Sequence, residues 1–189
     1  MPPRKPKNKQ VRAREYLRPD EVALLLKAAS KSGRHHKRDR ALILLIYRHG
    51  LRVGEAAGLR WHQIDWKLCQ IHVQREKNGK PSVQPLNGDE LRLLRWLRQE
   101  NPDHPFVFVG ELGAPLSERS IHRIVARAGE VAGLDFSCHP HMLRHGCGYY
   151  LASKGTDTRT IQDYLGHTDI KHTVQYTQLA PGRFVGLWD

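Results

Sequence analysis

The segment from residue 39 to residue 49 restricts the possible folds of this chain more than any other. Every residue from Ala41 to Ile46 is apolar, so a helix here is apolar around nearly its whole circumference. Such a helix has to be buried in a core. Gly50 follows directly and is the residue type that most readily ends a helix. The segment therefore predicts a core helix that ends at Gly50, and it is far too short to span a bilayer.

The remaining chain is dominated by helical patterns. Helices are predicted from Pro19 to about residue 29, at 89–100, after the capping residue Ser117, from Pro140 to about residue 154, at 158–165, and around Tyr176. Two alternating segments, 70–74 and 82–86, flank an Asn-Gly pair and predict a hairpin with a tight turn. Residues 106–109 read as a short buried strand. The pattern predicts an α+β fold, mainly α, with one small antiparallel sheet and a single folded domain over residues 19–179.

The charge of the chain favours a polyanionic partner. Lys and Arg number 31 against 19 acidic residues, which gives a net charge of +12, and double-stranded DNA is the expected partner. Residues 1–18 contain seven Lys or Arg and one acidic residue, so they predict a flexible basic arm that follows the DNA backbone; a solubilising tail is the alternative. The candidate DNA-binding residues are Arg4, Lys5, Lys7, Lys9, Arg12, Arg14, Lys80, Arg119 and Arg123. Solvated surface charges are the alternative for the hairpin residues Lys77 and Lys80 and for the arginine stripe, which Arg127 continues.

Cysteine usage and the N-terminus indicate a compartment. The chain has three cysteines without regular spacing, which argues against a disulfide framework and for a reducing environment. The N-terminus lacks the apolar core of a signal peptide. We therefore predict a cytoplasmic protein that, in a bacterium, associates with the nucleoid and not with a membrane.

Residues 139–177 gather side chains that suit attack on a phosphate. His141 and Arg144 are three residues apart and share a helix face. His167 follows a predicted helix end, and Tyr176 offers a phenol nucleophile. Arginine forks bind phosphate oxygens and stabilise the charge that develops in the transition state, and Arg52 and Arg144 are the candidate pair. Arg52 alone is equally compatible with a capping cation just past the core helix.

Other chemistries fit the sequence less well. Cys138, His139, His141, His145 and Cys147 resemble a zinc cluster, but neither HExxH nor paired CxxC is present. Scattered acidic residues disfavour a two-metal nuclease, and no GxxxxGK[ST] loop occurs. We therefore predict no metal and no cofactor.

Five motifs, in order, resemble those of the tyrosine recombinases, the phage integrase family. They are HGLRVGE at 49–55, REKNGK at 75–80, HMLRH at 141–145, LGH at 165–167 and HTVQYT at 172–177. The resemblance covers about residues 15–189. It is greatest to the short fimbrial phase-variation recombinases, which invert a promoter segment. It implies the catalytic-domain fold of that family.

The resemblance also implies a role for each matching residue. Tyr176 would form a 3′-phosphotyrosyl bond, and Lys77 on the hairpin would be the general acid. Arg52 and Arg144 would clamp the phosphate, with Glu55 as a supporting residue of the first motif. His141 and His167 would assist proton transfer. No metal or ATP would be required.

The family also implies an assembly. A homotetramer would act on two DNA sites, and a DNA-bending accessory protein is a further candidate partner. The apolar tail at 180–189 would dock on a neighbouring protomer through Phe184, Leu187 and Trp188. Two other functions stay open: relaxation of supercoils in the manner of a type IB topoisomerase, and a catalytically silent DNA-binding regulator. The apolar tail favours the recombinase over the topoisomerase, and the complete set of polar residues argues against the silent regulator.

Overall fold

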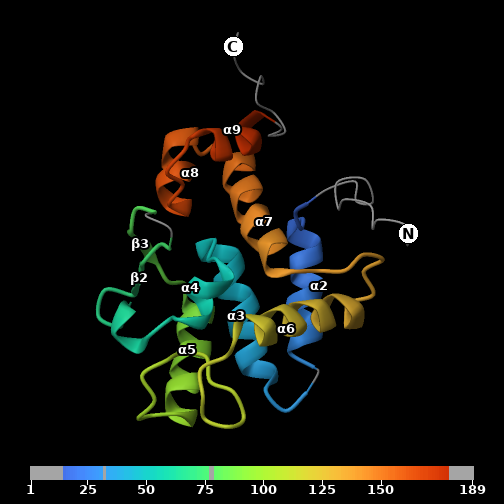
Figure 1. Ribbon diagram of the computed structural model, residues 1–189, viewed down its shortest axis with the longest axis vertical. Helices are drawn as coiled ribbons and strands as arrows, with labels where there is room; N and C mark the ends of the chain where they lie inside the picture. The colour runs from blue at the N-terminus through green and yellow to red at the C-terminus, as the bar shows by residue number, and fades with distance from the viewer. Residues whose placement is uncertain (1–14, 32, 77–78, 179–189) are drawn as a thin grey trace, which may run out of the picture.

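The computed structural model describes residues 15–31, 33–76 and 79–178 of the 189-residue chain (Figure 1). Several predicted residues lie outside this part: the arm residues Arg4, Lys5, Lys7, Lys9, Arg12 and Arg14, the hairpin residue Lys77, and the tail residues Phe184, Leu187 and Trp188. Residues 15–18, which the prediction included in the arm, lie on the folded body. Leu17 is 1% exposed, and its backbone N–H donates to the Met142 carbonyl over 3.2 Å.

Helix α3 (His36–His49) is the core helix (Figure 1). Its residues Ala41 to Ile46 are at most 3% exposed. It packs against α7 (Pro140–Ser153), α2 (Pro19–Ala29) and α5 (Gly88–Glu100). Gly50 ends it with a left-handed φ of 55°. The predicted core helix and its end are confirmed; the helix begins three residues earlier because its polar first turn carries no apolar signal.

The other helices surround this centre. They are α4 (Val53–Ala57), α6 (Glu118–Val131), α8 (Thr158–Leu165) and α9 (Lys171–Gln178). Ser117 caps α6 as predicted, because its Oγ accepts from the Ser120 N–H over 3.1 Å. Helix α4 was not predicted, and one short turn has no periodic signal of its own. A short 3-10 turn, η1 (Trp61–Gln63), leads into the sheet.

The sheet has three antiparallel strands in the order β1 (Ile64–Asp65), β2 (Gln70–Val73) and β3 (Ser82–Pro85). The predicted pairing of β2 with β3 is confirmed, with Val73 opposite Ser82. The predicted Asn-Gly turn includes Asn78, which lies outside the described residues, so the turn stays a prediction. After Val73 the chain turns Arg75 inward to bond Glu55 instead of extending the ladder. Strand β1, with two residues, is too short for an alternating pattern.

The predicted strand at 106–109 is also wrong. Phe106 and Val109 each form a single isolated bridge, to Arg60 and Pro115 respectively. Val107 and Phe108 are nevertheless 2% and 0% exposed. The apolar run thus correctly reported burial, but burial alone does not distinguish a strand from a buried loop.

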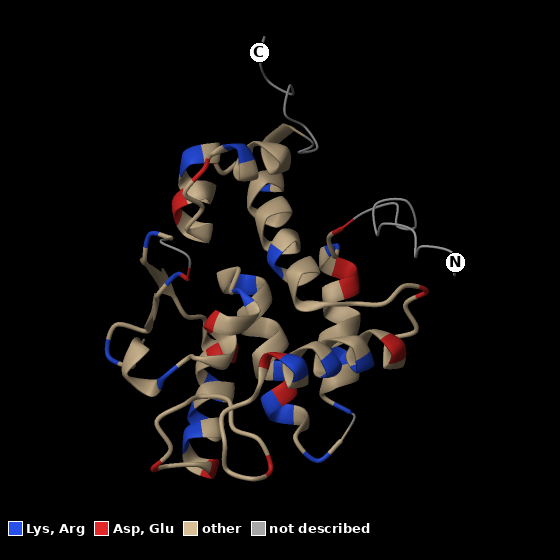
Figure 2. Cartoon of the chain, in the orientation of Figure 1, with Lys and Arg blue, Asp and Glu red and all other residues tan. Residues whose placement is uncertain are grey.

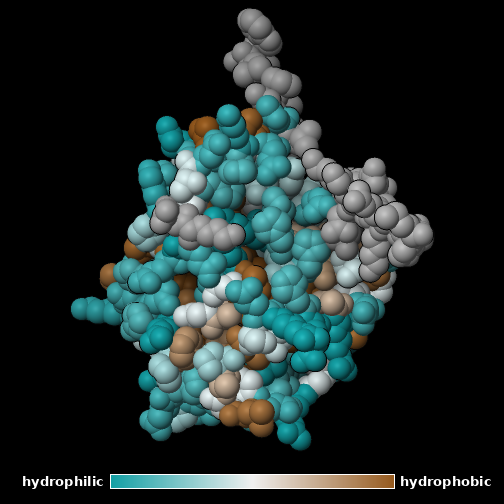
Figure 3. All heavy atoms as spheres, viewed as in Figure 1, coloured by the Kyte–Doolittle hydropathy of each residue, from teal (hydrophilic) through white to brown (hydrophobic). Residues whose placement is uncertain are grey.

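Two hydrophobic clusters flank the region of the motifs. The larger is centred on α3, and the smaller joins α7, α8 and α9 through Cys147, Ile161, Leu165 and Tyr176. Hydrophilic residues dominate the face seen in Figure 3. In the part of the chain described here, no helix is both long and apolar enough to cross a membrane.

Candidate active site

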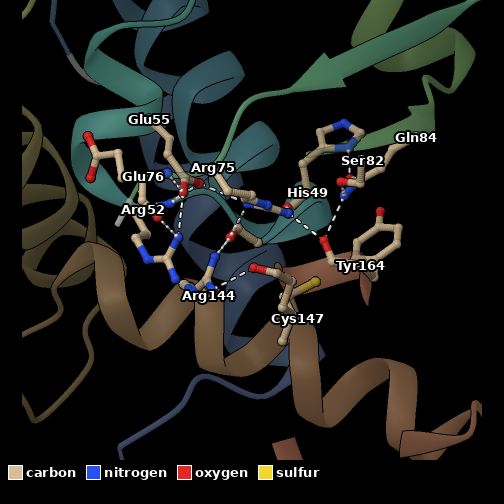
Figure 4. Close-up of polar contacts among 12 residues, drawn as sticks. His49, Arg52, Glu55, Arg75, Glu76, Ser82, Gln84, Arg144, Cys147 and Tyr164 are labelled. Atoms are coloured by element: carbon tan, nitrogen blue, oxygen red, sulfur yellow. Dashed lines mark hydrogen bonds and ion pairs between the residues drawn. The ribbon is translucent and has the colours of Figure 1, made fainter. Parts of the chain in front are cut away.

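The motif residues lie on or beside α4, α7, α8 and α9, and α7 packs against α3, α8 and α9. Figure 1 shows α7 running from the body of the molecule to α8 and α9. Arg52 lies at the start of α4 and Glu55 within it, and Arg144 lies on α7 (Figure 4). His167 follows α8, and Tyr176 lies on α9. The structure therefore brings together residues separated by more than a hundred positions.

Arg144 is fixed between two helix ends. It is 2% exposed, and it donates from Nη1 to the Gly50 carbonyl and from Nη2 to the Leu165 carbonyl, the latter over 2.8 Å. These carbonyls end α3 and α8, where the helix dipole favours a cation. Burial, followed by the charges of Arg75 and Arg52, lowers its pKa to about 10. Arg144 is therefore still a cation at pH 7.

Glu55 orients Arg52 at the start of α4. Arg52 occupies the N-cap position, and its backbone N–H donates to Glu55 Oε2 over 2.9 Å. Its Nη1 donates to Oε1 of the same carboxylate over 2.7 Å. Burial opposes ionisation of Glu55, but the charge of Arg75 and these bonds hold its pKa below the usual value. The Arg52 side chain is 24% exposed, so it remains within reach of a ligand.

Tyr176 is buried and hydrogen-bonded to His145. It is 1% exposed, and its phenol oxygen lies 2.7 Å from His145 Nδ1. Its ring packs edge-on against Tyr149 at 5.0 Å and stacks near His167 at 6.3 Å between centroids. Burial raises the pKa of Tyr176 above its ordinary value of 10. The resting phenol is therefore protonated and needs a base before it can attack.

The histidines around Tyr176 are neutral at pH 7. Burial, then the neighbouring His141 and Arg144, lowers the pKa of His145 to about 4. Burial, then Arg144, lowers that of His167 to about 3. In the tautomer that carries its proton on Nε2, a neutral His145 accepts the hydrogen bond of the Tyr176 O–H at Nδ1. His167 Nδ1 lies 2.8 Å from Thr173 Oγ1, which orients its ring.

His141 lies at the edge of this group. It is exposed, and its ring packs edge-on against His145 with 4.2 Å between centroids. Partial desolvation of the ring by the surrounding protein, then Arg144, lowers its pKa. The structure thus places His141 next to His145, which touches the predicted nucleophile directly.

The lowered pKa of His145 predicts that the folded protein is less stable in acid. Unfolding returns the pKa of His145 from about 4 to about 6.5, so between these values the unfolded chain binds a proton that the folded chain does not. Stability therefore falls as the pH falls. Allowing for partial exposure, His145 contributes a loss of about 1–2 kcal/mol between pH 7 and pH 5. Urea unfolding at both pH values measures it. His145→Gln should reduce the difference, and an unchanged free energy of unfolding in the unmodified chain would contradict the prediction.

Gly148 makes room for the Tyr176 ring. A Cβ at this α7 position would lie 2.6 Å from Cε2 and 2.7 Å from Cζ of Tyr176. Tyr149 and His167 restrict any movement of the ring away from that contact. Glycine at this position therefore allows α9 to pack closely on α7.

We expect Gly148→Ala to destabilise the protein by about 1–3 kcal/mol through overpacking. Helix propensity alone predicts the opposite sign, a gain of about 1 kcal/mol. Chemical denaturation distinguishes the two. Gly88→Ala is a matched control, since the nearest atom to its added Cβ, in the Arg92 side chain, is 3.9 Å away. A more stable Gly148→Ala protein would rule out the close contact.

The sequence analysis missed three residues of the site. His145 received a role there only as a candidate metal ligand, on the ground that it lies four residues after His141 on the same helix face. Arg75 and Thr173 lie inside quoted motifs but received no role. Among the described residues, no group of three or more His, Cys, Asp or Glu side chains is arranged to hold a metal ion.

The predicted DNA-binding residues that the structure describes are all exposed. Lys80 lies just before β3, and Arg119 and Arg123 lie on α6, where Figure 2 shows basic segments along the helix. Helix α6 packs against α4, which begins next to Arg52. Their contact with DNA stays a prediction.

Comparisons with known proteins identify the family of this chain. The sequence pattern of the phage integrase family matches residues 15–183. The type 1 fimbriae regulatory proteins FimB and FimE of Escherichia coli (strain K12) are 44% and 43% identical to this chain. Each alignment covers 93% of this chain, with 90% of FimB and 91% of FimE.

Solved structures share the fold. The XerA recombinase superposes with a TM-score of 0.77 at 27% identity, over 96% of this chain and 64% of the XerA chain. A DNA-bound XerH site-specific recombinase, at 24% identity, has a TM-score of 0.77 over 94% of this chain and 53% of its own, which is evidence for the fold alone. This chain therefore spans somewhat less than two thirds of XerA and about half of XerH. The predicted catalytic-domain fold is confirmed.

Proposed function

Because this chain belongs to the phage integrase family of tyrosine recombinases, we propose that it cleaves and rejoins DNA at specific sites with Tyr176 as its nucleophile. The observation that carries the assignment of Tyr176 is its 2.7 Å hydrogen bond to His145, which is neutral at pH 7. Arg144, a buried cation, lowers the cost of forming the phenolate nearby. His145 thus offers a base and Arg144 a positive field, the two features that activate a phenol as a nucleophile.

In the proposed reaction, Tyr176 Oη bonds to the phosphorus and the bond from phosphorus to the 5′ oxygen breaks. The phenol proton passes to His145 Nδ1. Arg144 uses one N–H of each terminal nitrogen on a carbonyl, which leaves its other N–H groups for a phosphate oxygen. Arg52 binds a second oxygen, and the two cations stabilise the growing charge.

Lys77 protonates the departing 5′ oxygen, a role that rests on its place in the REKNGK motif. His141 and His167 bond the phosphate and assist the proton transfers. A 5′ hydroxyl from another strand then attacks the phosphotyrosyl bond and releases Tyr176. One phosphodiester is exchanged for another, so no external energy source enters the reaction.

The proposal extends to partners and outcome. Double-stranded DNA is the substrate, and four copies of the chain act on two sites, with Phe184, Leu187 and Trp188 docking each tail on its neighbour. A DNA-bending accessory protein assists at the bacterial nucleoid. Inversion of a DNA segment is the favoured outcome. The similarity to two regulatory proteins of type 1 fimbriae supports it, because an inverted promoter is one way to regulate a gene.

Covalent adducts provide the test. The purified chain is mixed with fragmented genomic DNA of its source, and denaturant-resistant protein on DNA ends is isolated and sequenced. Adducts at one or two repeated sequences, absent with Tyr176→Phe, are the expected result. Adducts without sequence preference would contradict the recombinase assignment and support topoisomerase activity instead. A chain that binds DNA without any adduct would instead be a silent regulator.

The basic arm has its own test. Deleting residues 1–14 removes Arg4, Lys5, Lys7, Lys9, Arg12 and Arg14. We expect weaker DNA binding with a shallower salt dependence, by roughly 0.9 in the slope of log K against log salt for each phosphate that the shortened chain no longer neutralises. Fluorescence anisotropy at several salt concentrations measures both. An unchanged slope would leave the arm as a solubilising tail.

A further inference from the structure

Arg75 places a fully buried guanidinium beside the catalytic arginines. It lies two residues after the end of β2, and its side chain is 0% exposed. Nη1 donates to Glu55 Oε2 over 2.8 Å and to the Gly50 carbonyl over 3.1 Å. Nη2 donates to the His49 carbonyl over 2.9 Å and to the Tyr164 carbonyl. Three backbone carbonyls and one carboxylate thus fix the Arg75 guanidinium, which indicates a specific structural role.

Arg75 shares an acceptor with each catalytic arginine (Figure 4). The Glu55 carboxylate binds Arg75 through Oε2 and the Arg52 guanidinium through Oε1. The Gly50 carbonyl accepts from both Arg75 and Arg144. Movement of Arg75 would therefore be transmitted to both guanidiniums that face the phosphate.

The same residue joins two helix ends. Arg75 bonds the Tyr164 carbonyl and Arg144 bonds the adjacent Leu165 carbonyl, both at the end of α8. Each also bonds the Gly50 carbonyl at the end of α3. Because carbonyls at a helix C-terminus lack intrahelical partners and carry partial negative charge, they hold both cations in place.

Two glycines enclose the stem of Arg75. A Cβ on Gly166 would lie 2.5 Å from Arg75 Cγ, and one on Gly79 would lie 2.7 Å from Arg75 Cβ. The stem therefore has little freedom between the hairpin and the loop after α8. A shorter or differently shaped side chain would lose this packing together with the bonds.

Charge balance suits this role. Glu55 is the anionic partner of Arg75, at 2.8 Å, with side chains 0% and 2% exposed. The same carboxylate also pairs with Arg52 at 2.7 Å, so Glu55 offsets only one of the positive charges of Arg52, Arg75 and Arg144, and a net positive charge remains for a phosphate. We propose that Arg75 is a positioning residue that holds Arg52 and Arg144 in their phosphate-binding arrangement, an inference that rests on the proposed function of that site.

The test uses inorganic phosphate as the probe and NMR signals of the arginine Nε–H groups as the readout. The unmodified chain should show phosphate-dependent shifts at Arg52 and Arg144. Arg75→Lys keeps the charge but cannot reproduce the fork. We expect it to fold and to bind phosphate about tenfold more weakly, the loss of roughly one charge-assisted hydrogen bond. Arg95→Lys, at an exposed position of α5, is the matched control and should bind normally.

The outcomes separate positioning from a purely structural role. A folded Arg75→Lys protein with unchanged phosphate affinity would overturn the inference, even if its thermal midpoint fell. The inference would also be overturned if the Arg52 and Arg144 NMR signals of the unmodified chain did not shift on addition of phosphate. If Arg75→Lys does not fold, the double variant Arg75→Met with Glu55→Gln removes both buried charges together. Phosphate affinity in that variant equal to that of Glu55→Gln alone would also overturn it.

Failure of the proposed function is distinguishable from failure of this inference. Phosphate binding that depends on Arg75, without covalent adducts on DNA, would remove the recombinase activity and leave the positioning role. If the chain forms adducts on DNA but Arg75→Lys leaves the phosphate affinity unchanged, only the positioning role is contradicted.

Discussion

Tyr176→Phe abolishes covalent attachment to DNA and leaves DNA binding intact. The substitution removes the only atom that the proposed mechanism joins to phosphorus, so no residual adduct is expected. The ring keeps its contacts with Gly148 and Tyr149. Loss of the bond to His145 should cost about 1 kcal/mol and lower the thermal midpoint by about 2–4 °C. Denaturing gels of protein–DNA mixtures, with anisotropy for binding, measure both effects.

A matched control separates chemistry from packing. Tyr150 is 39% exposed on α7, so Tyr150→Phe removes a phenol of the same kind away from His145. It should form adducts at the normal rate. Adducts that persist in Tyr176→Phe would mean that another residue is the nucleophile.

Arg144→Lys should slow adduct formation by roughly 10²–10³-fold, the usual loss when one donor to a developing oxyanion is removed. An ammonium is a point donor, so it cannot bond the Gly50 and Leu165 carbonyls and still present parallel N–H groups to a phosphate. We also expect a loss of stability of about 1–3 kcal/mol, because one buried carbonyl loses its partner. Single-turnover cleavage of the DNA site recovered from the adducts gives the rate.

Arg95→Lys on the exposed face of α5 controls for the change of residue type. Cleavage by Arg144→Lys within about threefold of this control would remove Arg144 from the phosphate clamp, since the expected loss is far larger. Measuring at saturating DNA excludes an effect on binding alone.

The sequence was most informative where one local pattern decides the outcome. The apolar segment Ala41 to Ile46 allowed only a buried helix, and Gly50 and Ser117 marked helix ends that the structure has. Pairing of β2 with β3 followed from alternation on both sides of the hairpin. In the site, the motifs identified Arg52, Arg144, His167 and Tyr176, which the structure brings to one place.

The residues that were missed depend on contacts between distant parts of the chain. Arg75 bonds carbonyls 25 and 89 positions away, and no periodicity records such partners. His145 meets Tyr176 across 31 positions. The run at 106–109 failed for a related reason, because an apolar pattern reports exclusion from water without saying what the backbone pairs with.

The buried phenol has a consequence for the safety of the genome. With Tyr176 only 1% exposed, a phosphate on passing DNA cannot touch Oη while α9 stays packed on Gly148. If Tyr176 is the nucleophile, as proposed, α9 has to shift before Oη reaches a phosphate, and the bond to His145 describes the resting state of the phenol. An event that moves this helix would then decide when a strand is broken, so the packing of α9 on α7 would protect bound DNA from accidental nicks.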